Sequence, residues 1–146
     1  MTWAEKYMDT KTFHFENVNP KSKKTGDCVI RAIAKATGDT WDDTLDGLVY
    51  WMHKTRFDIS DPRCFNKYLY EKGFTMQRQP KKSDGKKYTG AQFCDYLNKS
   101  GKNVIVVANI GGHHTVAITR IENEYKVCDS WNSTDGCIGN YWVKYE

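Results

Sequence analysis

The chain has 146 residues, of which 39% are hydrophobic and 27% charged, and its formal net charge is +4. This length suits one domain with a single core, and the composition excludes a disordered or fibrous chain. The basic residues are scattered and form no stripe with interleaved aromatic residues, so we expect no nucleic-acid partner. No stretch approaches the roughly 18 apolar residues of a membrane span, and the N-terminus lacks the apolar core of a secretory signal. We therefore expect a cytoplasmic protein without a membrane partner.

The chain contains five cysteines, an odd number, and none lies close to another in the sequence. Zinc sites and small disulfide-stabilised domains show close cysteine pairs, so we expect at least one free thiol and no metal or cofactor. A metal site built from Cys128, Cys137, His53 and His113 is the alternative, but these residues lack the spacing of zinc ligands.

Four helices are predicted within the first two thirds of the chain. Residues 1–25 are polar and irregular, and we interpret them as an N-terminal arm with one short strand at 12–15. The segment behind Cys28 has apolar residues at helical spacing and stops at Gly38, so a helix should begin close to Cys28. N-cap residues, an N-terminal proline and a capping box mark three more helices. They run from Thr40 to Thr55, from Asp61 to Gly73 and from Thr89 to Gly101.

The last third of the chain is rich in β-prone segments. Apolar runs and alternating patterns predict four strands, at 104–110, 115–121, 125–128 and 141–145. Turn residues separate them, which predicts an antiparallel meander. Because the helices precede the strands, the order favours one α+β domain over residues 1–146, with N-terminal helices packed on a C-terminal antiparallel β-meander.

Three residues of complementary chemistry lie at the ends of these predicted elements. Cys28 starts a helix, where the helix N-terminus and a nearby imidazolium lower a thiol pKa from about 8.5 to roughly 3.5–7.5. His114 opens a strand behind a glycine turn, and a hairpin of the second and third strands would bring Asp129 close to it. One ring nitrogen of the base would then face the acid and the other the nucleophile. The alternatives are a small buried cysteine and a surface histidine.

The order of these three residues resembles that of papain-like cysteine peptidases, in which the nucleophile starts a helix and the other two residues lie on a following β-meander. The segment from His114 to Ala117 is similar to their His-x-Val-Ala strand. Asp129-Ser130-Trp131 is similar to their Asn-Ser-Trp, with Asp in place of Asn as in bacteriocin-leader peptidases and other compact bacterial members. The resemblance covers the functional residues between Gly26 and Trp131. It implies a papain-like fold with Cys28 as nucleophile, His114 rather than His113 as general base, and Asp129 as the orienting acid.

A second resemblance concerns the segment TGDCVIRAIAKATG and the following Trp41, which look like part of a group of small proteins encoded by bacteriophages and their hosts. It suggests a source for the protein and implies no activity. If the chain is phage-encoded, the expected location is the cytoplasm of the bacterial host.

Two positions depart from the papain-like pattern. Family members carry a glutamine six residues before the cysteine that helps to bind the oxyanion, and this chain has Ser22 there. We expect the backbone N–H of Cys28 as one oxyanion donor and the Asn19 side chain as the second, with Ser22 next. Val29-Ile30 replaces the small and aromatic residues that follow the cysteine of papain, so no substrate preference is carried over. Trp131 is expected either to shield the bond between His114 and its acid from water or to pack in the core.

The sequence thus predicts a cysteine hydrolase that cleaves a peptide, isopeptide or related amide bond through a thioester on Cys28. Its partner would be a protein or peptide substrate, with a host protein among the candidates. Transferases such as transglutaminases use the same three residue types, so the acyl donor stays open. The rival from another class is a non-catalytic, phage-encoded binding protein on a papain-like scaffold that acts on a host protein.

Overall fold

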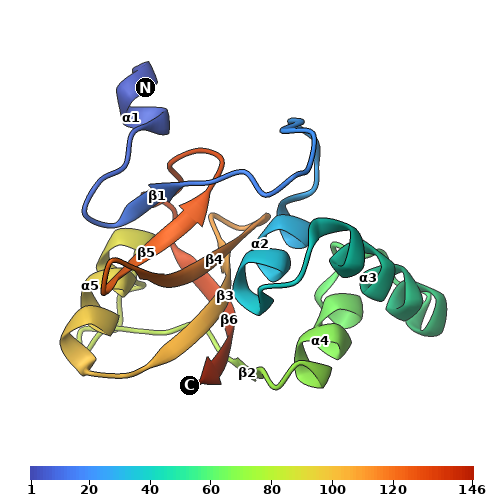
Figure 1. Cartoon of the computed structure of the whole chain (residues 1–146). Helices are drawn as coiled ribbons and strands as arrows, with labels where there is room; N and C mark the ends of the chain where they lie inside the picture. The colour runs from blue at the N-terminus through green and yellow to red at the C-terminus, as the bar shows by residue number, and fades with distance from the viewer.

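The computed structural model describes residues 1–146 and contains five helices and one six-stranded sheet (Figure 1). The mixed α+β class predicted from the sequence is confirmed. In chain order the elements are α1 Trp3–Tyr7, β1 Phe13–Phe15, α2 Cys28–Thr37, α3 Trp41–Thr55, α4 Pro62–Glu71, β2 Thr75–Gln77, α5 Gly90–Ser100, β3 Val104–Ile110, β4 His114–Ile121, β5 Glu124–Asp129 and β6 Ile138–Tyr145.

The helices begin and end where local signals predict. The Thr40 side chain accepts a hydrogen bond from the Asp43 backbone, and Thr89 forms a full capping box with Gln92. Gly38 ends α2 in the left-handed region, which glycine adopts without steric cost. Two short elements, α1 and β2, were not predicted from the sequence. Neither buries a single residue, so neither has the apolar pattern on which a prediction depends.

The strand order of the sheet is β1-β5-β4-β3-β6-β2. The antiparallel pairing of β3, β4 and β5 agrees with the prediction. The prediction that all four C-terminal strands form a simple antiparallel meander is nevertheless wrong, because other strands join both edges of the β3–β4–β5 unit. The outer edge of β5 pairs in parallel with β1, and β6 crosses over to pair with β3. Each added strand covers a row of backbone groups that would otherwise form an exposed sheet edge.

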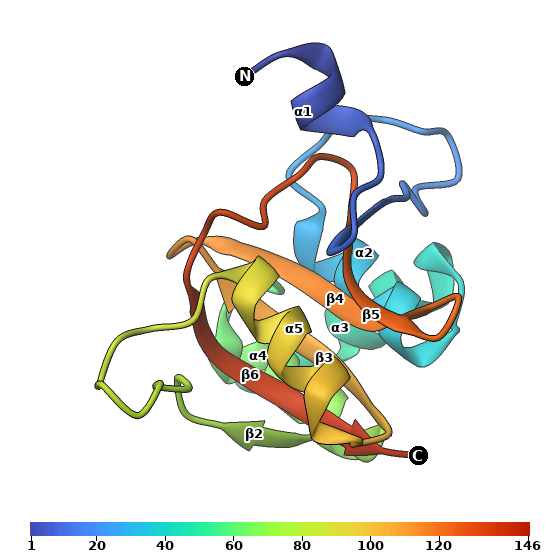
Figure 2. The same ribbon diagram turned by 90° about the vertical axis from the view of Figure 1, so that its left-hand side faces the viewer.

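Helices cover both faces of the sheet, as Figures 1 and 2 show. On one face, α2, α3 and α4 pack against Val107 and Trp142. On the other face, α5 packs through Phe93 against Val106 and Ile118. The expected packing of N-terminal helices on the strands thus involves both faces, with α2, α3 and α4 on one and α5 on the other. The position of α5 explains why every residue of β3 except Asn109 is apolar, since a strand covered on both faces has no polar side.

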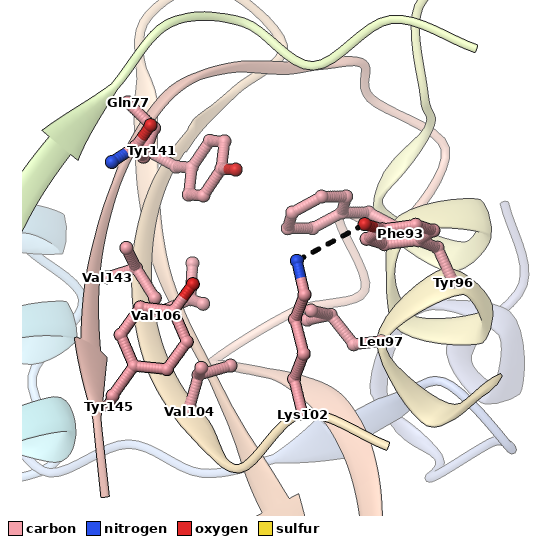
Figure 3. Close-up of a pocket in the computed structure, with 10 residues that line it drawn as sticks. All are labelled: Gln77, Phe93, Tyr96, Leu97, Lys102, Val104, Val106, Tyr141, Val143 and Tyr145. Atoms are coloured by element: carbon pink, nitrogen blue, oxygen red, sulfur yellow. Dashed lines mark hydrogen bonds between the residues drawn. The ribbon is translucent and has the colours of Figure 1, made fainter. Parts of the chain in front are cut away.

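A pocket of about 170 Å³ lies on the α5 face, between α5 and β6 (Figure 3). Phe93 and Tyr141 line it, and Lys102 Nζ donates a hydrogen bond to the Tyr96 hydroxyl at 3.3 Å across its mouth. The pocket is on the opposite face of the sheet from α2. Among the helices, none combines the length and the apolar character that crossing a membrane requires.

Candidate active site

The structure brings together the three residues that the sequence singled out. Cys28 is the first residue of α2, His114 the first of β4 and Asp129 the last of β5. Because β4 and β5 are antiparallel neighbours, the start of one lies beside the end of the other, and α2 packs across β4. His114 Nε2 lies 2.6 Å from Asp129 Oδ2. Nε2 is thereby engaged, which leaves Nδ1 as the ring nitrogen available to the Cys28 thiol, and the interaction of the two groups shifts the pKa of both.

The pKa values of Cys28 and His114 move in opposite directions. Burial alone would raise the pKa of the Cys28 thiol, but hydrogen bonds from His114 and from the Thr115 backbone outweigh it and lower the pKa below its usual value. Burial alone would lower the pKa of His114, but hydrogen bonds to Asp129 and Cys28 raise it to about 9. Opposite shifts of this kind favour a thiolate beside an imidazolium.

The Asp129 carboxylate is almost fully buried, and each of its two oxygens accepts two hydrogen bonds. Oδ2 accepts hydrogen bonds from His114 and, at 2.9 Å, from the Ser133 hydroxyl. Oδ1 accepts from the Ser130 backbone N–H at 2.7 Å and from the Arg31 guanidinium at 3.0 Å. A buried carboxylate held on both oxygens has one orientation, and it fixes the imidazole ring that it contacts.

Arg31 is a functional candidate that the sequence analysis missed. Its Nη1 contacts Asp129, and its Nε contacts Asp27 Oδ1 at 2.9 Å, so one guanidinium joins two buried carboxylates. Asp27 Oδ2 in turn accepts hydrogen bonds from Asn19 Nδ2 at 3.0 Å and from Trp41 Nε1 at 2.9 Å. Burial acts to raise the pKa of Asp27, but these bonds outweigh it and keep the carboxyl ionised. The i,i+4 spacing of Asp27 and Arg31 could have predicted the ion pair between these two residues.

The N-terminus of α2 is open beside the thiol. Asp27 occupies the N-cap position, but its side chain makes no capping hydrogen bond because it faces Arg31 and Trp41 instead. The Cys28 backbone N–H has no acceptor within the protein. Uncapped N–H groups at a helix start are suited to bind a developing negative charge.

The two residues predicted as additional oxyanion donors lie in the loop before α2. The Asn19 side chain is buried and donates to Asp27, so at least one of its two N–H groups is engaged there. Ser22 is exposed, has a positive φ of 52° and lines an open hollow with Trp3 and Tyr7. The assignment of either side chain to the oxyanion stays a prediction.

Trp131 covers the histidine. Its ring centroid lies 5.2 Å from that of His114, with the two planes tilted by 34°. The residue is 37% exposed, so the alternative of core packing is wrong. The indole lies against the imidazole ring, and its role in shielding the His114–Asp129 bond from water stays a prediction.

The remaining cysteines differ from Cys28. No disulfide is present. Burial raises the pKa of Cys64, Cys94 and Cys128, whereas Cys137 is exposed at the surface. No group of three or more His, Cys, Asp and Glu side chains lies close enough to hold a metal ion, so the alternative metal site has no structural support.

Comparison of the chain with protein-family models, with curated proteins and with solved structures finds no match.

Proposed function

We propose that this chain is a cysteine hydrolase of the papain-like type, with Cys28 as nucleophile, His114 as general base and acid, and Asp129 as the residue that orients His114. One observation carries the proposal: the Cys28 thiol lies at an uncapped helix N-terminus and interacts with an imidazole, each shifting the pKa of the other, and Nε2 of that imidazole lies 2.6 Å from a buried carboxylate. A nucleophile, a base and an orienting group in this arrangement are the parts that acyl transfer requires.

The proposed cycle forms and breaks one thioester. The Cys28 thiolate attacks the carbonyl carbon of an amide, and the oxyanion is bound by the Cys28 backbone N–H and by the predicted Asn19 donor. The His114 imidazolium gives its Nδ1 proton to the departing amine, which leaves an acyl-enzyme. Neutral His114 then removes a proton from water, the hydroxide adds to the thioester, and the acid product leaves as the thiolate and the imidazolium form again. The substrate in this scheme is a protein or a peptide.

The fold supports a papain-like assignment in part. The nucleophile starts the first long helix, and the base and the acid follow on neighbouring antiparallel strands, as in that superfamily. The expected localisation in a bacterial host and the phage origin depend on the resemblance of the TGDCVIRAIAKATG segment and of Trp41, and they remain part of the proposal.

The pH dependence of Cys28 alkylation tests the function directly. Iodoacetamide modification of each cysteine is followed by mass spectrometry across pH, in the wild-type chain and in His114→Ala. We expect Cys28 to react with an apparent pKa well below about 8.5, and this pKa should rise in the variant. Exposed Cys137 serves as the accessible reference thiol in the same sample. The proposed hydrolase would be refuted if Cys28 reacts no faster than Cys137 and if its alkylation profile is the same in His114→Ala.

The rival function, a non-catalytic binding protein, is favoured by one observation. The Asn19 amide donates to Asp27, so at most one of its two N–H groups is left for an oxyanion, in addition to the Cys28 backbone N–H. Loss of one donor typically costs about 10²–10³ in turnover. An inert binder has no reason to lower the thiol pKa, so the alkylation experiment separates the two functions.

A further inference from the structure

A hollow beside the proposed active site carries the further inference. It lies between α1, the loop before α2 and the turn after β5. Its wall includes Lys6, Tyr7, Lys24, Arg31, Ser130 and Trp131. A wider hollow of about 800 Å³ shares Tyr7, Lys24 and Ser130 with it and adds Trp3 and Phe15.

The hollow adjoins the reacting groups. Ser130 and Trp131 directly follow Asp129 in the chain, and the Trp131 ring lies against His114. Arg31 contacts the hollow and the Asp129 carboxylate. A chain segment bound in the hollow would therefore continue toward Cys28.

The hollow is positively charged, and its lysine side chains are not paired with carboxylates of the protein. Lys6 from α1 and Lys23 and Lys24 from the loop line it, and none of the three forms a salt bridge. Lys24 Nζ donates to the Tyr7 hydroxyl at 3.3 Å. The single carboxylate in the wall, Asp27, is already bound by Arg31, Asn19 and Trp41.

Apolar surface accompanies these charges. Trp3 is 70% exposed and Phe15 is 43% exposed, and both line the wider hollow. Exposed aromatic rings that gather beside unpaired cations form a surface that binds amphipathic ligands rather than simple salts. The Tyr7 ring lies between them, with its centroid 5.7 Å from that of Trp3 and 6.1 Å from that of Phe15.

The arm that carries Lys6 and Phe15 is attached to the rest of the site by its backbone. The Asn132 backbone N–H donates to the Lys6 carbonyl at 2.8 Å, and Phe15 pairs with Asp129 in the β1–β5 ladder. Substitution of the lysine side chains leaves these backbone bonds in place, so the charge of the hollow can be changed without removing its wall.

We infer that the substrate of the proposed hydrolase is an acidic polypeptide segment, in which aspartate or glutamate side chains bind the lysines of the hollow and neighbouring apolar side chains lie on Trp3 and Phe15. The inference rests on the proposed function, because acyl chemistry at Cys28 requires a carbonyl substrate and so favours a peptide over a nucleic acid. Opposite charge in a concave site also raises the rate at which such a segment arrives.

The charge of the hollow is measured first with two small alkylating probes, anionic iodoacetate and neutral iodoacetamide, at about 0.01 M ionic strength, where screening extends over about 30 Å. The variant is Lys6→Gln/Lys23→Gln/Lys24→Gln. We expect the iodoacetate-to-iodoacetamide rate ratio at Cys28 to fall by about fivefold to tenfold in it, for three unit charges at roughly 10 Å in water. The ratio at Cys137 should change much less.

The matched control removes the same number of charges from the other lysine cluster. Lys81→Gln/Lys82→Gln/Lys86→Gln changes the loop between β2 and α5, which lies far from α1 (Figure 2). We expect this control to leave the Cys28 ratio unchanged. An unchanged ratio in the first variant, or equal falls in both, would overturn the inference.

Binding of the inferred substrate class is measured on the full chain with Cys28→Ala, which cannot turn over. The probes are fluorescein-labelled octapeptides of alternating glutamate and leucine, or glutamine and leucine, and an octathymidylate, followed by fluorescence anisotropy. We expect the glutamate peptide to bind at least tenfold more tightly than the glutamine peptide, and the Lys6/Lys23/Lys24 variant to abolish this preference. Equal binding of the two peptides, or tighter binding of octathymidylate, would overturn the inference.

The two failures are distinguishable. If Cys28 shows the depressed alkylation pKa but no charge preference, the substrate class is wrong and the hydrolase stands. If Cys28 has an ordinary pKa while the acidic peptide binds through the three lysines, the chain recognises acidic segments without catalysis, and the inferred substrate falls together with the enzyme.

Discussion

Removal of the Arg31 charge is the most informative single perturbation of this molecule. The guanidinium is only 11% exposed and bridges two carboxylates that are 5% and 1% exposed. Arg31→Gln leaves Asp27 and Asp129 buried without their shared cation. Removing one partner of a buried ion pair typically costs about 3–5 kcal/mol.

That loss is a large part of the stability of an ordinary domain, which is about 5–15 kcal/mol. With an m-value of about 2 kcal/mol/M in urea, a loss of about 4 kcal/mol lowers the unfolding midpoint by about 2 M. Arg31→Lys keeps the charge but has one ammonium in place of the planar fork, so it should lie between the wild type and Arg31→Gln.

Arg31 should also influence the thiol through space. Its positive charge is one of the factors that lower the pKa of Cys28, after the hydrogen bonds from His114 and Thr115. The apparent alkylation pKa of Cys28 should therefore rise in Arg31→Gln, by less than in His114→Ala. This readout separates a positioning residue from one that only stabilises the fold.

The control is Lys35→Gln on the same helix. Lys35 pairs with Glu16 at 3.1 Å in a more exposed setting, so its loss should cost within about 1 kcal/mol and leave the Cys28 profile unchanged. A double-mutant cycle of Arg31→Gln with Asp129→Asn completes the test, because two residues in direct contact should show a coupling of about 0.5–3 kcal/mol. If the alkylation profile of Arg31→Gln coincides with that of the wild type and the cycle is additive, the assigned role of Arg31 is wrong.

Three further outcomes follow from the same geometry. Asp129→Asn should slow Cys28 alkylation at neutral pH by no more than about tenfold, because an amide oxygen can still accept from His114; complete loss would show that the negative charge itself sustains the thiolate. Trp131→Ala exposes the His114–Asp129 bond to water, and the weakening of this bond should outweigh the relief of burial and lower the imidazolium pKa of His114, measured by NMR, from about 9, whereas Trp131→Phe should largely preserve it; an unchanged pKa in the alanine variant would remove the shielding role. The raised pKa of His114 gives stability that is complete below its unfolded pKa and is lost as pH rises to about 9, and the lowered pKa of Cys28 gives the opposite slope. Because the two slopes oppose each other, the urea stability of the wild type should fall less steeply above about pH 6.5 than that of Cys28→Ala, which should fall by up to about 1.4 kcal/mol per pH unit; parallel curves would show that the thiol is not ionised.

Local signals explain which parts of the fold could be predicted from the sequence. N-caps, a capping box and C-terminal glycines lie within a few residues of the helix ends that they fix. The turns between β3, β4 and β5 are equally local. The pairing of β1 with β5 joins Phe13 to Val127, and no short-range pattern contains that information. The apolar stripe of α5 shows that the helix packs on something, but not which face of the sheet it covers.

The same distinction applies to the site. The sequence could predict Cys28, His114 and Asp129 as site residues because each lies at the end of a predictable helix or strand. Arg31 reaches across 98 positions of the chain to Asp129, and a helical arginine gives no sign of that contact. Asn19 was predicted as an oxyanion donor from its position, but the sequence does not reveal that its amide also donates to a buried carboxylate.

The acid at position 129 accounts for the rest of the buried polar network. A neutral asparagine would need only hydrogen bonds, whereas a carboxylate that is 1% exposed needs a compensating charge, because an isolated buried ion is very costly. Arg31 supplies that charge, and its remaining N–H groups then require a second acceptor, which is Asp27. Asp27 in turn takes up the Asn19 amide and the Trp41 indole, and it is thereby turned away from capping α2. The network that neutralises Asp129 thus also leaves the helix N-terminus open beside Cys28, so one set of contacts serves both the base and the oxyanion of the proposed reaction.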